Sequence, residues 1–268
     1  MIAWSLVDTA QVPGGGELRL MRRGAEFSIR LGHNELMNSR LGGSEAALAT
    51  MACERIRGRR RPRILIGGLG MGFTLRAALC GLDAQARVIV AELVPAVLAW
   101  AQGPMAQVFG ASLTDARVRI READVARLIR QARSAFDAIL LDVDNGPAGL
   151  TRTANDRLYD LDGLSAARAA LRPGGVLAVW SSGPDRNFIR RLRQAGFGVD
   201  EVRLRANAAR GGARHLVWIA TRAEQGKNNQ LRSLSRNRTR GHAGAPEPNP
   251  PAPSASRSSR RRCLRPES

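Results

Sequence analysis

The stretch Ile66-Gly67-Gly68-Leu69-Gly70-Met71-Gly72-Phe73 decides the fold. An apolar strand predicted at 63–66 runs into these glycines, and a predicted helix at 73–80 follows them. Glycine lets the chain turn sharply and lets a ligand approach the backbone, because no Cβ is in the way. The dinucleotide-binding fingerprint G-x-G-x-x-G would need a third glycine where Phe73 stands. The spacing of Gly68, Gly70 and Gly72 instead favours an adenosyl cofactor of the S-adenosylmethionine type; the alternative is a tight strand–helix turn that binds nothing.

Strands and helices alternate from residue 63 to about residue 222, which predicts a mostly parallel sheet with helices on both faces. Two late strands, at 199–204 and 215–220, have no helix between them and predict an antiparallel hairpin at one edge. This is the order of a class I methyltransferase-like (Rossmann-like) α/β fold. The further strands are expected at 86–91, 118–121, 138–141 and 176–180, and the further helices at 94–108, 124–133, 158–171 and 185–195.

Short apolar runs separated by glycine turns predict a small antiparallel β-unit near the N-terminus, with strands at 2–7, 17–21 and 26–31. A connecting helix is expected at 44–56, with Ser44 as its N-cap. The last stretch is rich in Arg, Ser, Asn and Pro, and its composition predicts disorder. We therefore expect three parts: a β-unit with its helix at 1–60, an adenosyl-binding α/β domain at 61–222, and a basic tail at 223–268.

The formal charge of +19 suggests nucleic acid at first sight, but Lys227 is the only lysine, and so strong a preference for arginine indicates a compositional bias of the genome. The tail carries ten basic and three acidic residues. A solvated tail without a partner and salt-dependent nucleic-acid binding by the tail are the two interpretations. With no membrane-length apolar run and no signal peptide, we expect a cytoplasmic protein without membrane contact. Scattered Cys and His residues predict no metal site, and Cys53 and Cys80 are expected to be buried.

Two acids follow predicted strands of the parallel sheet. Glu92 ends the strand after the glycine loop, 24 residues beyond Gly68, where an acid can accept hydrogen bonds from both ribose hydroxyls. The alternative is an ordinary surface acid. Asp124 follows the next strand, where an acid faces the adenine amino group in this fold; it fits a helix N-cap equally well.

A third acidic segment, Asp142-Val143-Asp144-Asn145-Gly146-Pro147, follows the apolar strand at 138–141. Acids at this edge of the sheet can bind a cationic amine or take a proton from an attacking ammonium. A lone aspartate after a strand is often a turn former, but two of them favour an acceptor site. Both Asp142 and Asp144 are candidate catalytic acids, and Asp142 is preferred because it stands directly at the strand end.

At these motifs the chain resembles the spermidine synthase family of aminopropyltransferases over about residues 63–220. The loop from Ile66 to Arg76 is similar to the family's G-G-G-D-G-G-x-x-R, and Ala91-Glu92-Leu93 to its V-E-I/L-D. Ala123-Asp124 is similar to G-D, the segment 139–147 to I-x-D-S-x-D-P-x-G-P, and Leu158-Tyr159 to L-[YF]. The resemblance implies a transferase that uses S-adenosylmethionine or its decarboxylated form, takes a small amine as acceptor, takes part in polyamine biosynthesis and forms a homodimer.

The chain departs from the family at one loop position: Met71 stands where the family has the aspartate that contacts the donor's amine. Ser44-Glu45 lies near the place of the family's N-terminal Tyr-His-Glu, and Gln11 is a weak candidate for donor contact. Three hypotheses follow. The first is an aminopropyltransferase, the second a small-molecule methyltransferase with the same donor site, and the third a non-catalytic adenosyl-binding protein whose tail docks on RNA.

Overall fold

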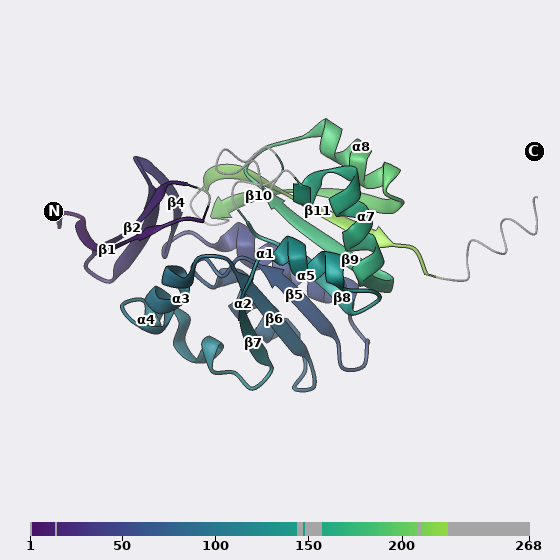
Figure 1. The fold of residues 1–268 in the computed structure, drawn as a ribbon, viewed down its shortest axis with the longest axis horizontal. Helices are drawn as coiled ribbons and strands as arrows, with labels where there is room; N and C mark the ends of the chain where they lie inside the picture. The colour runs from purple at the N-terminus through teal and green to yellow at the C-terminus, as the bar shows by residue number, and fades with distance from the viewer. Residues whose placement is uncertain (1, 14, 144–146, 148–156, 208–210, 225–268) are drawn as a thin grey trace, which may run out of the picture. The chain divides into compact units, whose positions relative to one another are not determined.

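The computed structural model of the chain describes residues 2–13, 15–143, 147, 157–207 and 211–224 (Figure 1). The predicted catalytic candidate Asp144 and nearly all of the predicted tail lie outside the described residues. No described helix is long and apolar enough to cross a membrane. Within the same residues, no group of three or more His, Cys, Asp or Glu side chains is placed to hold a metal ion.

The first part of the described chain is a four-stranded antiparallel sheet in the order β1-β2-β3-β4. Its strands are β1 (Ser5–Gln11), β2 (Glu17–Arg23), β3 (Glu26–Leu31) and β4 (Asn34–Asn38). The small N-terminal β-unit is thus confirmed, although its first strand lies later than the predicted 2–7. β4 was not predicted, because Asn-Glu-Leu-Met-Asn has neither β-branched residues nor a regular alternation. One side of the sheet is apolar and buried, with Leu20 and Ile29 at its centre.

The second sheet has seven strands in the order β10-β11-β9-β8-β5-β6-β7. β5 to β9 are parallel, and β10 and β11 pair as an antiparallel hairpin at one edge. This confirms the predicted fold class. In such sheets ligands bind at the carboxyl ends of the strands where the strand order reverses, and here that point is β5. The strands are β5 (Arg63–Gly67), β6 (Arg87–Glu92), β7 (Val118–Glu122), β8 (Phe136–Leu141), β9 (Leu171–Ser181), β10 (Phe197–Asn207) and β11 (Gly211–Arg222).

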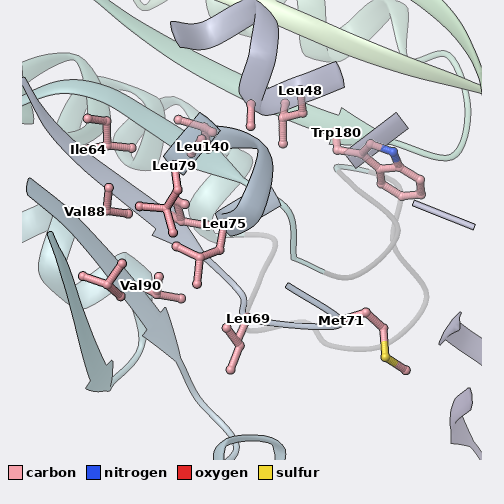
Figure 2. Packing of buried hydrophobic residues seen from close by; sticks show 14 of the residues in the cluster. Leu48, Ile64, Leu69, Met71, Leu75, Leu79, Val88, Val90, Leu140 and Trp180 are labelled. Carbon is pink, nitrogen blue, oxygen red and sulfur yellow. The ribbon is translucent and has the colours of Figure 1, made fainter. Parts of the chain in front are cut away.

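Alternate residues of the parallel strands enter two separate apolar clusters, because successive side chains point to opposite faces. One face packs against α1 (Gly43–Arg55), α2 (Phe73–Gly81), α3 (Pro95–Gln102) and α4 (Ala106–Phe109), which the 3-10 turn η1 (Gly110–Leu113) follows. The other face packs against α5 (Val125–Gln131), α7 (Leu161–Ala170) and α8 (Arg186–Gln194). Figure 2 shows the first cluster, in which Leu48 of α1 and Leu75 of α2 lie among strand residues Ile64, Val88 and Leu140.

Several predicted boundaries were wrong for local reasons. The helix expected at 94–108 is two helices, since Gly103 and Pro104 stand between α3 and α4. The helix expected at 158–171 begins at Leu161, because the Asp160 carboxylate accepts a hydrogen bond from the Gly163 amide and caps it there. Cys53 is buried as expected, but Cys80 at the end of α2 is exposed.

The prediction that Ser44 caps α1 was also wrong. The N-cap residue is Gly42, which makes no side-chain hydrogen bond. Ser44 lies inside the first turn and is fully buried. Its hydroxyl contacts Glu45 and His215 instead of a backbone amide, which brings it into the candidate site.

Candidate functional site

The glycine loop joins the end of β5 to the start of α2 at the carboxyl edge of the sheet. Gly68, Gly70 and Gly72 have φ angles of +87°, +51° and +72°, in the left-handed region that favours glycine. A Cβ on Gly68 would lie 2.5 Å from the backbone oxygen of Asp142, and one on Gly72 would lie 2.5 Å from the Phe109 ring. The loop therefore needs glycine for its backbone and for its close neighbours, and Gly68 and Gly70 line the cleft described below.

Met71 of the same loop is not among the residues that line the cleft. Its side chain is 3% exposed and packs in the same apolar cluster as Leu69 and Leu75 (Figure 2). Its carbonyl oxygen accepts a hydrogen bond of 2.9 Å from Nη1 of Arg76, which also donates to the Val108 carbonyl over 2.8 Å. Where the resembled family places an acid, this chain places a core residue.

Glu92 is the last residue of β6 and is buried, with 8% of its surface exposed. This excludes the interpretation as a surface acid. Its Oε2 accepts a hydrogen bond of 2.9 Å from the Leu69 amide, and its Oε1 accepts one of 2.9 Å from the Val94 amide. Burial raises the pKa of Glu92, and the backbone hydrogen bonds oppose that rise. The backbone amides of Leu93 and Gly70 also favour the charged form, so the carboxylate is held by the backbone around it at the cleft wall.

A cleft opens between the N-terminal sheet and the carboxyl edge of the parallel sheet. Glu92, Asp124 and Asp142 line it, and no arginine, lysine or histidine is among the described residues that do. Most of the wall is apolar, as expected for a small-molecule site. The wall includes Leu18, Ile29, Leu31, Leu36 and Met37 from the N-terminal sheet and Val94, Val97, Val125 and Val143 from the α/β part.

The structure confirms that Asp124 caps a helix. It is the N-cap of α5, and its Oδ1 accepts a hydrogen bond of 2.7 Å from the Ala126 amide. It also lines the cleft, so a contact with adenine stays a prediction beside the cap. Gln11 is exposed at the end of β1 and is not among the residues that line the cleft, whereas its neighbour Val12 is.

Asp142 follows Leu141 at the end of β8 and lies beside the glycine loop. Its Oδ2 accepts a hydrogen bond of 2.6 Å from the Thr74 hydroxyl. Burial and the nearby negative charge of Glu45 raise the pKa of Asp142 to about 7, against the opposing effect of Thr74. A carboxyl group with such a pKa is suited to exchange protons near neutral pH.

A chain of polar contacts that the sequence did not indicate lies next to Asp142. The Ser44 hydroxyl is 2.7 Å from Oε2 of Glu45 and 2.8 Å from Nδ1 of His215 on β11. The His215 ring meets Trp180 of β9 edge to face, with centroids 4.7 Å apart. Burial lowers the pKa of His215, while Glu45 opposes this effect. Only the place of Ser44-Glu45 was suggested by the sequence; nothing near His215 or Trp180 marked them.

The comparisons with known proteins come from sequence and from structure. No protein-family model matches the chain. Over 124 residues it is 33% identical to polyamine aminopropyltransferase 1 of Streptomyces coelicolor, which covers 45% of this chain and 22% of that protein. Over 145 residues it is 28% identical to the polyamine aminopropyltransferase of Mycobacterium tuberculosis, and this match covers 51% of this chain and 27% of that protein. The chain is a distant relative of the polyamine aminopropyltransferases. It spans about a quarter of the length of these curated relatives.

Solved structures with a similar fold include two spermidine synthases. The crystal structure of spermidine synthase from Thermotoga maritima is similar with a TM-score of 0.65 at 17% identity, over 81% of this chain and 73% of that one. A spermidine synthase in complex with the transition-state analogue AdoDATO is similar with a TM-score of 0.63, also at 17% identity, over 81% and 72%. At such identity the likeness shows the fold alone, which is that of S-adenosylmethionine-dependent methyltransferases.

Proposed function

We propose that this protein is a transferase that moves an aminopropyl group from decarboxylated S-adenosylmethionine to a small amine. The observation that carries the proposal is the charge of the cleft: its described lining holds three carboxyl groups and no basic side chain. A decarboxylated donor has lost its only negative group and keeps a sulfonium and an amine, and the acceptor amine is a cation in water. An acidic cleft stabilises both cations, whereas the carboxylate of intact S-adenosylmethionine would be repelled.

The donor site is proposed around Glu92 and the glycine loop. Glu92 would accept hydrogen bonds from the two ribose hydroxyls, because its carboxylate is held by the Leu69 and Val94 amides at the cleft wall. Gly68 and Gly70 would let the adenosyl group approach the backbone without a Cβ between them. Asp124 would face the adenine amino group while it caps α5.

Asp142 is the proposed base. The amine nitrogen attacks the carbon bonded to the sulfonium, the carbon–sulfur bond breaks, and its electron pair stays on sulfur as a neutral thioether. Before the attack, the acceptor ammonium gives a proton to the Asp142 carboxylate, which frees the nitrogen lone pair. The Thr74 hydrogen bond fixes the orientation of that carboxylate. Sulfur loses its charge in this step, so the residues contribute mainly alignment and deprotonation.

Methyl transfer from intact S-adenosylmethionine is the second candidate, and Met71 favours it. The buried methionine side chain offers no negative charge to the donor's amine at the loop position where the resembled family has an acid. In this case the same groups, Glu92 and Asp142, would serve the ribose and the acceptor, and the transferred group would be the methyl of the sulfonium.

Titration calorimetry with S-adenosylmethionine, its decarboxylated form and methylthioadenosine separates these functions. Tighter binding of the decarboxylated donor supports the first proposal, and tighter binding of the intact donor supports the second. Glu92→Gln should weaken all three ligands alike by about tenfold, since they share the ribose. If folded protein binds none of the three, both transferase proposals fail and the cleft serves another ligand.

Product analysis tests the reaction itself. Mass spectrometry after incubation with each donor and a panel of amines should show an amine heavier by one aminopropyl group. Asp142→Asn should bind the donor normally and slow the transfer by about a hundredfold or more. An unchanged rate in this variant would remove Asp142 from the mechanism.

A further inference from the structure

The helices on the two faces of the parallel sheet differ in charge. The three described helices of one face, α5, α7 and α8, carry seven arginines and a single acid, Asp162. The helices of the other face, α1 to α4, carry two arginines and two acids. An arginine-rich composition would raise the charge of both faces, so a compositional bias does not explain the difference.

The charge is densest on α8, which has four arginines and no acid in nine residues. Phe188 and Leu192 face the core, and Arg186, Arg190 and Arg193 are exposed on the opposite side. Their spacing of four and three residues puts them in one row along the helix, about 5–6 Å apart at their Cβ atoms. Together with Ile189 and Gln194 they line a shallow groove.

These three guanidinium groups have no hydrogen bond or ion pair within the described part of the chain. Their neighbour Arg191 differs, since it donates to the Tyr159 carbonyl over 2.9 Å and pairs with Asp185 over 3.4 Å. The charge of Arg191 is thus used inside the fold, while the row of three is free to meet an external anion. Arg127 of α5 is a fourth exposed arginine of this face without a side-chain partner in the described residues.

We propose that the row Arg186, Arg190 and Arg193 binds the phosphate backbone of double-stranded DNA. The planar guanidinium fork matches phosphate oxygens, and a row of them can follow one strand. The described residues of α5, α7 and α8 expose no aromatic side chain, so this face offers no platform for the stacked bases of a single strand. Duplex RNA is recognised by its A-form shape and by contacts to 2′-hydroxyls as well as phosphates, and a row of arginines alone supplies only the phosphate contacts.

A membrane surface is the other large polyanion, and the face fits it less well. Peripheral helices insert aromatic or large aliphatic side chains below the lipid headgroups. The exposed residues of α8 are arginine, asparagine and glutamine, and Leu161 at the start of α7 is the large exposed apolar residue of this face among those described. The proposed contact uses no residue of the cleft, so it stands or falls apart from the transferase proposals.

Fluorescence anisotropy with a labelled 20-base-pair DNA duplex tests the proposal on the full chain between 50 and 200 mM salt. The test variant is R186Q/R190Q/R193Q. The control variant, R57Q/R60Q/R87Q, removes the same charge from exposed arginines that likewise have no side-chain partner among the described residues. Every variant keeps the basic tail, so the tail's contribution is common to all. We expect the test variant to bind at least about tenfold more weakly, and its salt slope to fall by about 2 to 3.

If the triple variant unfolds, single variants replace it. R186Q, R190Q and R193Q should each lower the slope of log binding constant against log salt concentration by about 0.9. Equal losses in the test and control triples would overturn the proposal, because net charge alone would then explain binding. Tighter binding of a 20-nucleotide single strand or of a duplex RNA would overturn the choice of partner. The choice of partner would also be overturned if the protein did not bind DNA but sedimented with phosphatidylglycerol vesicles, and if the test variant lost that sedimentation.

Discussion

Asp142 holds its carboxyl group where burial and Glu45 disfavour a negative charge. Its pKa is about 7 in the fold and 3.8 as a reference for the unfolded chain. The fold therefore loses stability as the pH rises from about 4 to 7, because the unfolded chain releases the proton earlier, and the loss is constant above that range. The raised pKa that suits Asp142 to its proposed role as a base thus lowers the stability of the protein at neutral pH.

Asp142→Asn should make the folded protein more stable, because the amide keeps an oxygen for Thr74 and cannot ionise. We expect the gain in melting temperature to be small at pH 4 and to grow to at least about 5 °C at pH 8. Calorimetric scans of both proteins from pH 4 to 8 measure it. The control is Asp162→Asn, at an exposed acid of α7, which should give no pH-dependent gain in melting temperature. A gain that does not depend on pH would contradict the raised pKa.

The sequence could indicate single residues only where the fold puts them at a predictable place. Glu92 and Asp142 end strands of a parallel sheet, so their positions at its carboxyl edge followed from the pattern. Ser44 and His215 are 171 residues apart, and their contact depends on how α1 packs against β11. No local pattern carries that information. The burial of Met71 was equally invisible, because a loop methionine can face a ligand or the core.

At the scale of elements, β5, β6 and β8 were predicted to within about two residues because buried parallel strands are short, continuous apolar runs. The errors fell where the apolar pattern is weak or where a local feature overrides it. β4 is polar, and the helix expected at 94–108 has an unbroken apolar periodicity across Gly103 and Pro104. Pattern predicts the type of an element, and capping or a proline decides where it ends.

The glycine loop gives a prediction at this scale, since Gly68→Ala should disturb the junction of β5 with β8. A Cβ there would lie 2.5 Å from the Asp142 carbonyl, so the backbone of the proposed base must shift. Gly58→Ala is the control: Gly58 has a φ of +84° but open space around its Cβ position. Both variants pay the left-handed backbone cost of about 1 kcal/mol. We expect Gly68→Ala to unfold at lower urea concentration than Gly58→Ala and to bind the donor at least about tenfold more weakly. Equal effects would mean that the close contact relaxes freely.

At the scale of the folded unit, the cleft depends on the N-terminal sheet and the α/β sheet together, because each supplies part of the wall. One polar contact between them is a hydrogen bond of 2.7 Å from the Trp100 indole of α3 to Oδ2 of Asp8 on β1. This bond lowers the pKa of Asp8. Trp100 is 2% exposed and packs in the shared apolar cluster, whereas Asp8 is exposed, so the bond joins the surface of β1 to the core of the α/β part.

Asp8→Ala should therefore loosen the N-terminal sheet against α3 and weaken donor binding. The alanine variant removes the hydrogen bond that joins the two parts, whereas Asp8→Asn keeps an oxygen in reach of the indole and serves as the control. We expect the alanine variant to bind the donor on the order of fivefold more weakly, with hydrogen exchange faster in β1 and β2 than in β5 and β8. The asparagine variant should behave like the wild type. If both variants bind the donor equally well, the wall formed by the N-terminal sheet does not depend on this bond, and the apolar contacts of Leu18 and Ile29 hold it alone.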